Sequence, residues 1–403
     1  MSDVATMTFD KLKALDTAHV MQTYAGRYDV AFVRGAGARL WDSEGNEYLD
    51  FLSGIAVASL GHAHPAVAEA LTDQAATLLH VSNFFLNAWQ PRLAAKLDAL
   101  LGGDGRVFCA NSGAEANECA IKLARRYGQT HGGPERYHVL STYGSFHGRT
   151  LTTLAATGQP QKQETFQPLP SGFHQVEFAD VDALSAAMDE RVCAVLLEPV
   201  QGEGGVVPAP AGYLQAVREL CTEQEALLIV DEVQTGLGRT GRWFGFEHAG
   251  IRPDIVTLAK ALGNGMPIGA CWARNEVASA FRPGDHATTF GGQPLAARVA
   301  YTVLEVMADL DVPGRAARAG KRLAAGLTAL PGVTAVRGLG LLLGAELDGR
   351  LTAGDVTARC LRAGLVVNAV TPTTVRLAPS LLVSDEEIDE ALGILGRVLQ
   401  EAA

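Results

Sequence analysis

The feature of this chain that most restricts its fold is the alternation of short apolar runs with helical stretches between residues 106 and 273. Six runs have the length and composition of buried strands: Arg106–Ala110, Val139–Thr142, Val192–Leu197, Ala226–Val230, Ile255–Leu258 and Ile268–Ala273. Helical spacing of apolar residues marks stretches between them: Ala114–Tyr127, Val181–Met188 and Gly212–Glu223. Apolar strands that alternate with helices are typical of a mainly parallel sheet, so we expect a central α/β domain.

The two ends of the chain have a different pattern. Apolar and polar residues mix over short distances between residues 31 and 51, with turn signals between them, which predicts short antiparallel strands. Helices are expected over 65–79 and 89–101. Near the C-terminus we expect a long helix over 295–330 and a pair of strands over 333–347 that turns at Gly338 and Gly340. Two further strands are expected over 366–368 and 374–377, and a closing helix over 384–400 with Ser384 as its cap.

These patterns predict a large α/β domain with a mainly parallel central sheet and a smaller α+β domain made from both chain ends. The large domain is placed at residues 61–294. The small domain is placed at residues 1–60 and 295–403. A chain of 403 residues is long enough for such a division.

Charge and composition exclude several classes of protein. The net charge of -11 disfavours a general nucleic-acid binder, because phosphate contacts need clustered Lys and Arg. No stretch resembles a membrane span, and Met1–Leu15 lacks the sections of a secretory signal. We therefore expect a cytoplasmic protein that binds neither nucleic acid nor a membrane.

The cysteines and histidines do not predict a metal centre or disulfides. The six cysteines are scattered among apolar or small residues without a CxxC pair, so buried thiols are expected. His62 and His64 are the one tempting pair of metal ligands, but no further Cys or His follows at ligand spacing. No metal is expected.

Three segments at predicted strand ends carry polar residues, and ligands of open α/β sheets collect at the carboxyl ends of strands. In the first, Ser112, Gly113 and Ala114 follow a strand and open a helix. Free N–H groups at a helix N-terminus favour a phosphate, although ordinary capping by Ser112 would explain the same residues. The chain has no dinucleotide-binding or P-loop fingerprint.

The other two segments hold an acidic residue and a lone lysine. Asp231 directly follows an apolar run, where a carboxylate pairs well with a protonated ring nitrogen or simply caps a turn. Lys260 lies among apolar and small residues. Desolvation there would lower its pKa and suit it to Schiff-base chemistry, unless it extends its amine to solvent.

In this order and context, the segments resemble the class III aminotransferases of the fold-type-I pyridoxal-phosphate superfamily. The resemblance covers the chain from about Tyr24 to the C-terminus. It rests on these stretches: 51–57, 60–65, 111–117, 146–150, 198–205, 231–236, 260, 289–292 and 375–379.

The resemblance implies that pyridoxal 5'-phosphate is the cofactor. Lys260 would attach it covalently and then move a proton, Asp231 would pair with the pyridine nitrogen, and Gln234 would contact the phenolic oxygen. Phe146 would stack on the ring, and Thr289 of a partner subunit would join the phosphate site of a homodimer. The complete cofactor set is Ser112, Gly113, Ala114, Phe146, Asp231, Val233, Gln234, Lys260 and Thr289.

The resemblance also implies the substrates. Arg149 would clamp the carboxylate remote from the reacting amine, and Arg376 would bind the α-carboxylate of glutamate. Glu203 would act as a gate on Arg376, and Thr288 would lie at the substrate. The implied reaction moves the δ-amino group of N2-acetyl-L-ornithine to 2-oxoglutarate, which gives N-acetyl-L-glutamate 5-semialdehyde and L-glutamate in arginine biosynthesis.

The chain departs from the family pattern at Ala58, Thr288 and Gln293, and these departures bear on the substrate more than on the cofactor. Three alternatives stay open. The first is an ω-aminotransferase for succinylornithine, ornithine or 4-aminobutyrate. The second is an aminomutase on the same scaffold. The third is a non-enzymatic binding protein, which would not need Lys260 together with Asp231 and Arg149.

Overall fold

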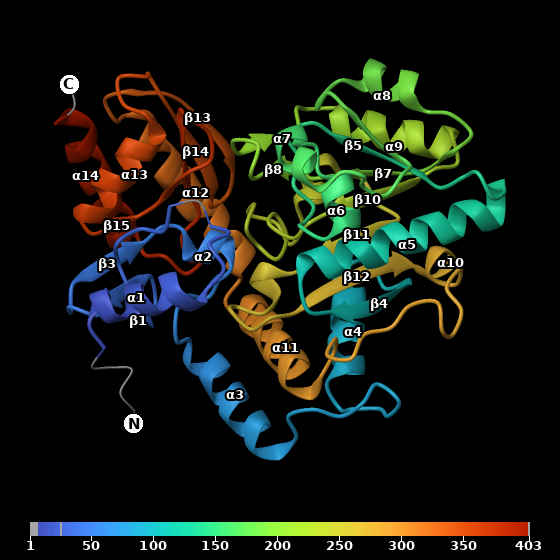
Figure 1. The fold of residues 1–403 in the computed structure, drawn as a ribbon, viewed down its shortest axis with the longest axis horizontal. Coiled ribbons are helices and arrows are strands. Elements are labelled where there is room, and N and C mark those ends of the chain that lie inside the picture. Colours follow the sequence, from blue (N-terminus) through green and yellow to red (C-terminus); the bar gives the residue numbers. More distant parts are fainter. Residues whose placement is uncertain (1–6, 25, 402–403) are drawn as a thin grey trace.

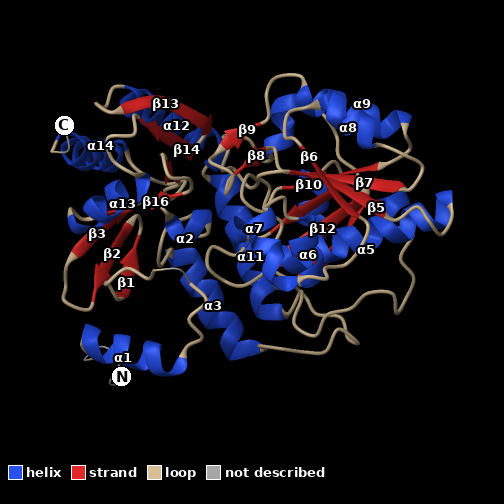
Figure 2. Cartoon of the chain, turned by 45° about the horizontal axis from the view of Figure 1, so that its top comes forward, coloured by secondary structure: helices blue, strands red, loops and turns tan. Residues whose placement is uncertain are grey.

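The structure, a computed structural model, describes residues 7–24 and 26–401. Figure 1 shows two bodies: the large sheet with its helices at the right, and a smaller body at the left. In the smaller body the blue N-terminal and red C-terminal segments lie side by side. Figure 2 shows the same two bodies. The helix α11 (Pro294–Asp309) lies between them and packs on α3 (Pro65–Thr77) and α4 (Gln90–Leu100).

The large sheet has seven strands in the order β4-β12-β11-β10-β7-β5-β6. The five strands from β11 to β6 are parallel, and β12 is antiparallel to both of its neighbours. The predicted mainly parallel sheet is therefore confirmed. In chain order the strands are β4 (Gly105–Ala110), β5 (His138–Thr142), β6 (Phe173–Val176), β7 (Val192–Leu197), β10 (Leu227–Asp231), β11 (Ile255–Leu258) and β12 (Gly269–Arg274).

Helices cover both faces of this sheet, which explains why its central strands are mostly apolar. Figure 2 shows α8 (Val181–Ala187) and α9 (Tyr213–Glu223) on one face, and α5 (Gly113–Gly132) and α6 (Leu151–Ala156) on the other. Every residue of β7, β10 and β11 is buried. Strands covered on both sides lose the polar alternation of a half-exposed strand.

The smaller body joins the two ends of the chain in one sheet. The strands β1 (Phe32–Ala36), β2 (Arg39–Asp42) and β3 (Glu47–Asp50) are antiparallel, as predicted, and β15 (Leu365–Val366) pairs parallel with β3. A second sheet has the order β13-β14-β17-β16. Its bounds are β13 (Val333–Leu339), β14 (Leu342–Leu347), β16 (Asn368–Ala369) and β17 (Thr374–Leu377). The domain boundaries after residues 60 and 294 stay predictions.

Several local predictions need correction. The single helix expected over 295–330 is two helices, α11 and α12 (Val312–Thr328), because Asp311 has φ +44° and caps α12 by accepting from the Gly314 N–H. The strand expected over 366–368 is divided between β15 and β16, which belong to different sheets. Asp231 is the last residue of β10 rather than the first one after it.

Other predictions are confirmed. Ser384 caps α14 (Asp385–Gln400) by accepting from the Glu387 N–H at 3.2 Å. All six cysteines are buried and unpaired. Among the described residues no helix combines the length and apolarity needed to cross a membrane. The remaining elements are α1 (Phe9–His19), α2 (Ser53–Ala56), α7 (Pro160–Gln163), β8 (Val200–Gln201), β9 (Val207–Pro208), α10 (Asn275–Ala278) and α13 (Ala353–Arg362).

Candidate active site

A cavity of about 410 Å³ lies at the carboxyl edge of the large sheet. The residues that follow β4, β10 and β11 line it, because all three strands end at this edge of the sheet. The strand β4 has the direction of β11, since β12 between them is antiparallel to both. The structure brings ten of the predicted site residues together around this cavity: Ser112, Gly113, Ala114, Phe146, Arg149, Glu203, Asp231, Val233, Gln234 and Lys260.

Asp231 is the most constrained charge in this cavity. Its side chain is buried, and its Oδ2 accepts hydrogen bonds from Asn117 Nδ2 and His147 Nδ1, both at 2.8 Å. Its Oδ1 accepts from the backbone N–H of Val233 at 3.0 Å. A buried carboxylate needs such donors to stay charged, and here they also fix its orientation.

Asn117 and His147 were assigned no role from the sequence, although both lie in stretches that carry the family resemblance. Asn117 Nδ2 also donates to the backbone carbonyl of His147 at 2.8 Å, so α5 and the 143–150 segment are joined at Asp231. The one signal in the sequence is that Asn117 is a polar residue on the otherwise apolar buried face of this helix.

The cavity wall contains buried polar atoms without a protein partner. Within the described residues, Asn117 Oδ1 and His147 Nε2 have none. Such atoms are rare because an unpaired buried polar group costs about 1–3 kcal/mol. Both residues line the cavity, so a polar ligand seated there would have hydrogen-bonding groups to meet.

Lys260 follows β11 and also lines the cavity. Its backbone has φ +40°, an uncommon conformation for a residue other than glycine. Burial lowers the pKa of its amine to about 8, with Arg376 adding to this effect and Glu203 opposing it. About a tenth of the amine is therefore uncharged at pH 7, and an uncharged amine is the nucleophile that Schiff-base chemistry needs.

The start of α5 combines a cap with a close approach of the backbone. Ser112 Oγ accepts from the Glu115 N–H at 3.2 Å, so the ordinary cap considered from the sequence is present. A Cβ on Gly113 would lie 2.8 Å from the Val233 side chain, which leaves room only for glycine. The cap and an anion site are compatible, because the other N–H groups of the first turn remain available to the cavity.

Arg376 and Glu203 form an ion pair at the cavity. Arg376 Nη1 lies 2.5 Å from Glu203 Oε1 and donates to Gln234 Oε1 at 3.3 Å, and its Nε donates to Asn368 Oδ1 at 3.1 Å. Burial alone would raise the pKa of Glu203, but the charge and hydrogen bond of Arg376 outweigh burial and lower it. Glu203 is therefore ionised, and its carboxylate pairs with the guanidinium of Arg376.

Phe146 and Arg149 also line the cavity. The Arg149 Cζ is 5.5 Å from the centroid of the Phe146 ring. The backbone N–H of Phe146 donates to Glu198 Oε1 at 2.9 Å, and Glu198 Oε2 accepts from Gly202 N–H at 3.2 Å. Glu198 was assigned no role from the sequence. Burial raises its pKa to about 7, and it ties the Phe146 segment to the loop that holds Glu203.

Thr288 and Thr289 are not brought to this cavity within the chain. They line a separate cavity, where Thr288 Oγ1 accepts from the Gly291 N–H at 3.1 Å and from Asn111 Nδ2 at 3.3 Å. Gln293 accepts from the Val81 N–H at 2.9 Å and donates to the Thr289 carbonyl at 3.0 Å. Ala58 is buried.

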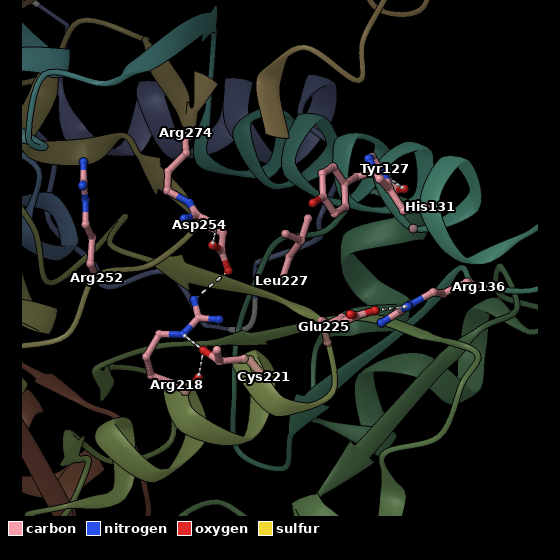
Figure 3. Close-up of a pocket in the computed structure, with 13 residues that line it drawn as sticks. Tyr127, His131, Arg136, Arg218, Cys221, Glu225, Leu227, Arg252, Asp254 and Arg274 are labelled. Atoms are coloured by element: carbon pink, nitrogen blue, oxygen red, sulfur yellow. Dashed lines mark hydrogen bonds and ion pairs between the residues drawn. The ribbon is translucent and has the colours of Figure 1, made fainter. Parts of the chain in front are cut away.

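A larger cavity of about 580 Å³ lies at the opposite edge of the sheet, where β10 and β11 begin (Figure 3). Asp254 is buried there between Arg218, at 2.6 Å, and Arg274, and it also accepts from the Leu228 N–H at 2.7 Å. Its charge is balanced within the protein. We therefore assign this cavity a structural ion cluster and place the candidate active site at Lys260.

His62, considered as a metal ligand from the sequence, has a carboxylate partner instead. Its Nε2 lies 2.7 Å from Asp50 Oδ2. Asp50 also accepts from the Ser53 N–H at 2.8 Å, so this pair links the end of β3 to the turn that follows it.

Comparison with known proteins identifies the family. The model of the class-III aminotransferases matches residues 21–399, and the chain belongs to this family. It is 50% identical over 388 residues to the acetylornithine aminotransferase of Caldanaerobacter subterraneus subsp. tengcongensis, covering 95% of this chain and 98% of that protein. It is 47% identical over 391 residues to the acetylornithine aminotransferase of Methanocaldococcus jannaschii, covering 96% and 97%.

Solved structures agree with this assignment. The ornithine aminotransferase of Toxoplasma gondii ME49 has a TM-score of 0.94 at 36% identity, covering 98% of this chain and 96% of that one. The acetylornithine aminotransferase of Elizabethkingia anophelis has a TM-score of 0.87 at 31% identity, covering 98% and 100%. The chain is thus an aminotransferase of fold type I that depends on pyridoxal phosphate, as the sequence predicted.

The lowered pKa of Lys260 predicts how cofactor capture depends on pH. With protein freed of cofactor, the rate of covalent attachment of pyridoxal phosphate should rise about tenfold per pH unit up to about pH 8 and level off above it. Below this pKa the amine is protonated and is not nucleophilic. Stopped-flow absorbance between pH 6 and 10 measures the rate, and Lys260→Ala is the blank. A rate that keeps rising to pH 10 would contradict the lowered pKa.

Proposed function

We propose that the chain is an acetylornithine aminotransferase that acts in arginine biosynthesis. It transfers the δ-amino group of N2-acetyl-L-ornithine to 2-oxoglutarate and gives N-acetyl-L-glutamate 5-semialdehyde and L-glutamate. The observation that carries this proposal is the Glu203–Arg376 ion pair beside Lys260, together with the exposed Arg149 on the cavity wall. Glu203 covers Arg376, whereas Arg149 is accessible. This arrangement fits a substrate that has a terminal amine and a single remote carboxylate. The relatives named above support the same substrate.

We propose that this cavity binds pyridoxal phosphate, because its lining offers a partner for each chemically distinct group of the cofactor. Asp231 would pair with the pyridine nitrogen, and the first turn of α5 at Gly113 would hold the phosphate. Lys260 would form the covalent link, Phe146 would cover the ring, and Gln234 would meet the phenolic oxygen. Ser112, Ala114 and Val233 would complete the pocket wall. When bound, the cofactor supplies an electron sink for the carbanion that forms on the substrate.

The residues of this chain would orient the amine substrate and move its proton. Arg149 would hold the remote carboxylate, which presents the terminal amine to the cavity floor. Lys260 Nζ would remove the proton from the substrate carbon that bears the nitrogen. A pKa of about 8 suits an amine to act as both base and acid near neutral pH.

The second half of the reaction needs a second carboxylate site. 2-Oxoglutarate carries two carboxylates, so Glu203 would have to leave Arg376 before the α-carboxylate could bind to it. Arg376 is 1% exposed and its Nη2 has no partner among the described residues, so a buried donor is available for that carboxylate. Gln234 and Asn368 hold the guanidinium in place when Glu203 moves.

We propose a cytoplasmic homodimer with shared active sites. The segment after α3 exposes Phe84 and Leu86 at 92% and 96% of their surface, and Phe290 is 64% exposed. Asn83 Nδ2 donates to the carbonyls of Thr288 and Gly291, both at 3.0 Å, so these exposed apolar residues form one surface. Apolar surfaces of this kind bind partners. A second copy would cover it and bring Thr289 to the phosphate, with Thr288 at the substrate.

The first test is steady-state turnover with 2-oxoglutarate. Acetylornithine, succinylornithine, ornithine and 4-aminobutyrate are compared by kcat/KM, with Lys260→Ala as the blank. We expect acetylornithine to lead by about tenfold or more, the range that one group in a pocket supplies. A lead by another amine would reject the substrate and keep the chemistry. An isomerised product formed without 2-oxoglutarate would favour the aminomutase.

The second test concerns the dimer. Leu86→Asp should give a monomer in analytical ultracentrifugation and lose most of its activity, because a charge at this surface would block the partner that completes the site. Leu310→Asp, at a partly exposed leucine between α11 and α12, is the matched control and should remain a dimer. A dimeric and active Leu86→Asp protein would place the interface elsewhere.

A further inference from the structure

A second cation lies beside Arg149. Lys162, on the short helix α7, has its Nζ 5.4 Å from the centroid of the Phe146 ring, and Arg149 Cζ is 5.5 Å from the same centroid. Phe146 and Arg149 both line the active-site cavity. Two positive side chains therefore lie close to one aromatic ring of the cavity wall, although Lys162 itself is outside the set of lining residues.

Gln159, directly before α7, and Gln163, on α7, anchor the backbone that carries Lys162. Gln159 Nε2 donates to the Ser145 carbonyl at 2.9 Å. Gln163 Nε2 donates to the carbonyls of Leu154 at 3.0 Å and Thr157 at 2.8 Å. These bonds tie α7 to the segment that carries Phe146 and Arg149. Lys162 is therefore held next to the cavity rather than carried on a free surface turn.

The two cations lack an anion between them. Within residues 7–24 and 26–401, neither Lys162 nor Arg149 has a carboxylate within 4 Å. Glu203 is the carboxylate whose charge raises the pKa of Lys162, and Glu203 itself is paired with Arg376. Burial and the like charge of Arg149 lower the pKa of Lys162, while Glu203 opposes them. Such a pair is destabilised until an anion binds between its members.

We propose that Lys162 determines specificity by forming, with Arg149, a two-cation subsite for the carboxylate remote from the reacting amine. This inference rests on the proposed function and adds a residue to it. The guanidinium fork supplies directional hydrogen bonds, and the ammonium on its flexible stem supplies a point charge. The subsite favours amines that carry a remote carboxylate over amines of the same length that lack it.

A matched pair of substrates tests this subsite in the holoenzyme. N-Acetylputrescine equals N2-acetylornithine without its carboxylate. For Lys162→Met we expect kcat/KM with acetylornithine to fall about tenfold, through KM, as for one charge-assisted contact, while turnover of N-acetylputrescine keeps its wild-type value. Lys162→Arg should recover most of the loss. Lys321→Met, which removes an exposed lysine on α12, should change neither substrate.

Binding gives a readout that does not depend on turnover. N2-Acetylnorvaline keeps the carboxylate and lacks the terminal amine, so its Kd by calorimetry reports the subsite alone. We expect it to weaken about tenfold in Lys162→Met and to be unchanged in Lys321→Met. An unchanged Kd in Lys162→Met, or equal losses with both substrates, would overturn the proposal and leave Lys162 a structural role on Phe146.

The proposed function and this inference fail separately. If the wild-type enzyme does not turn over acetylornithine, the proposed function is rejected. The Michaelis constant for the keto acid 2-oxoglutarate in Lys162→Met then still tests the subsite, because the remote carboxylate of this keto acid would bind the same two cations. If acetylornithine is the best substrate and Lys162→Met binds every carboxylate like the wild type, only the inference is rejected.

Discussion

The buried carboxylate of Asp231 is the constraint around which the active site is built. A charge at the end of a fully apolar strand is tolerated only with donors around it, and these come from three places: Asn117 on α5, His147 on the segment after β5, and the backbone of Val233. Because each donor contacts Asp231, the segment that carries the donor must lie at the carboxyl edge of the sheet. The same requirement brings the start of α5 and the Phe146 segment to the cavity that Lys260 lines.

A second buried carboxylate, that of Glu232, stabilises the segment that follows Asp231. Glu232 accepts from the backbone N–H groups of Gly245 and Phe246, both at 2.9 Å, and from Thr235 Oγ1 at 2.5 Å, and burial raises its pKa to about 7. Glu198 does the same for the Phe146 segment. The apolar sheet thus supplies rigidity, and buried acidic groups at its edge position the loops that carry the chemistry. The cavity at the opposite edge of the sheet differs, because two arginines already balance the charge of Asp254 there.

The sequence predicted what burial imposes on composition and missed what depends on three-dimensional contacts. The strands β7 and β11 were predicted to the residue because they are covered on both faces and, apart from Thr257, are apolar. The edge strand β6 was missed because His174 and Gln175 interrupt its apolar pattern. Asn117 and His147 received no role, since their importance lies in a contact with Asp231 across more than 80 residues of chain. Lys162 belongs to no motif, and only its place over the Phe146 ring reveals it.

The central proposal is that Asp231, oriented by Asn117 and His147, would keep the pyridine nitrogen of the cofactor protonated. The most direct test is the ¹⁵N chemical shift of holoenzyme prepared with pyridoxal phosphate labelled at this nitrogen. The account predicts a protonated nitrogen in the wild type across pH 6 to 9 and a neutral one in Asp231→Ala. A neutral nitrogen in the wild type, or a protonated one in Asp231→Ala, would contradict it.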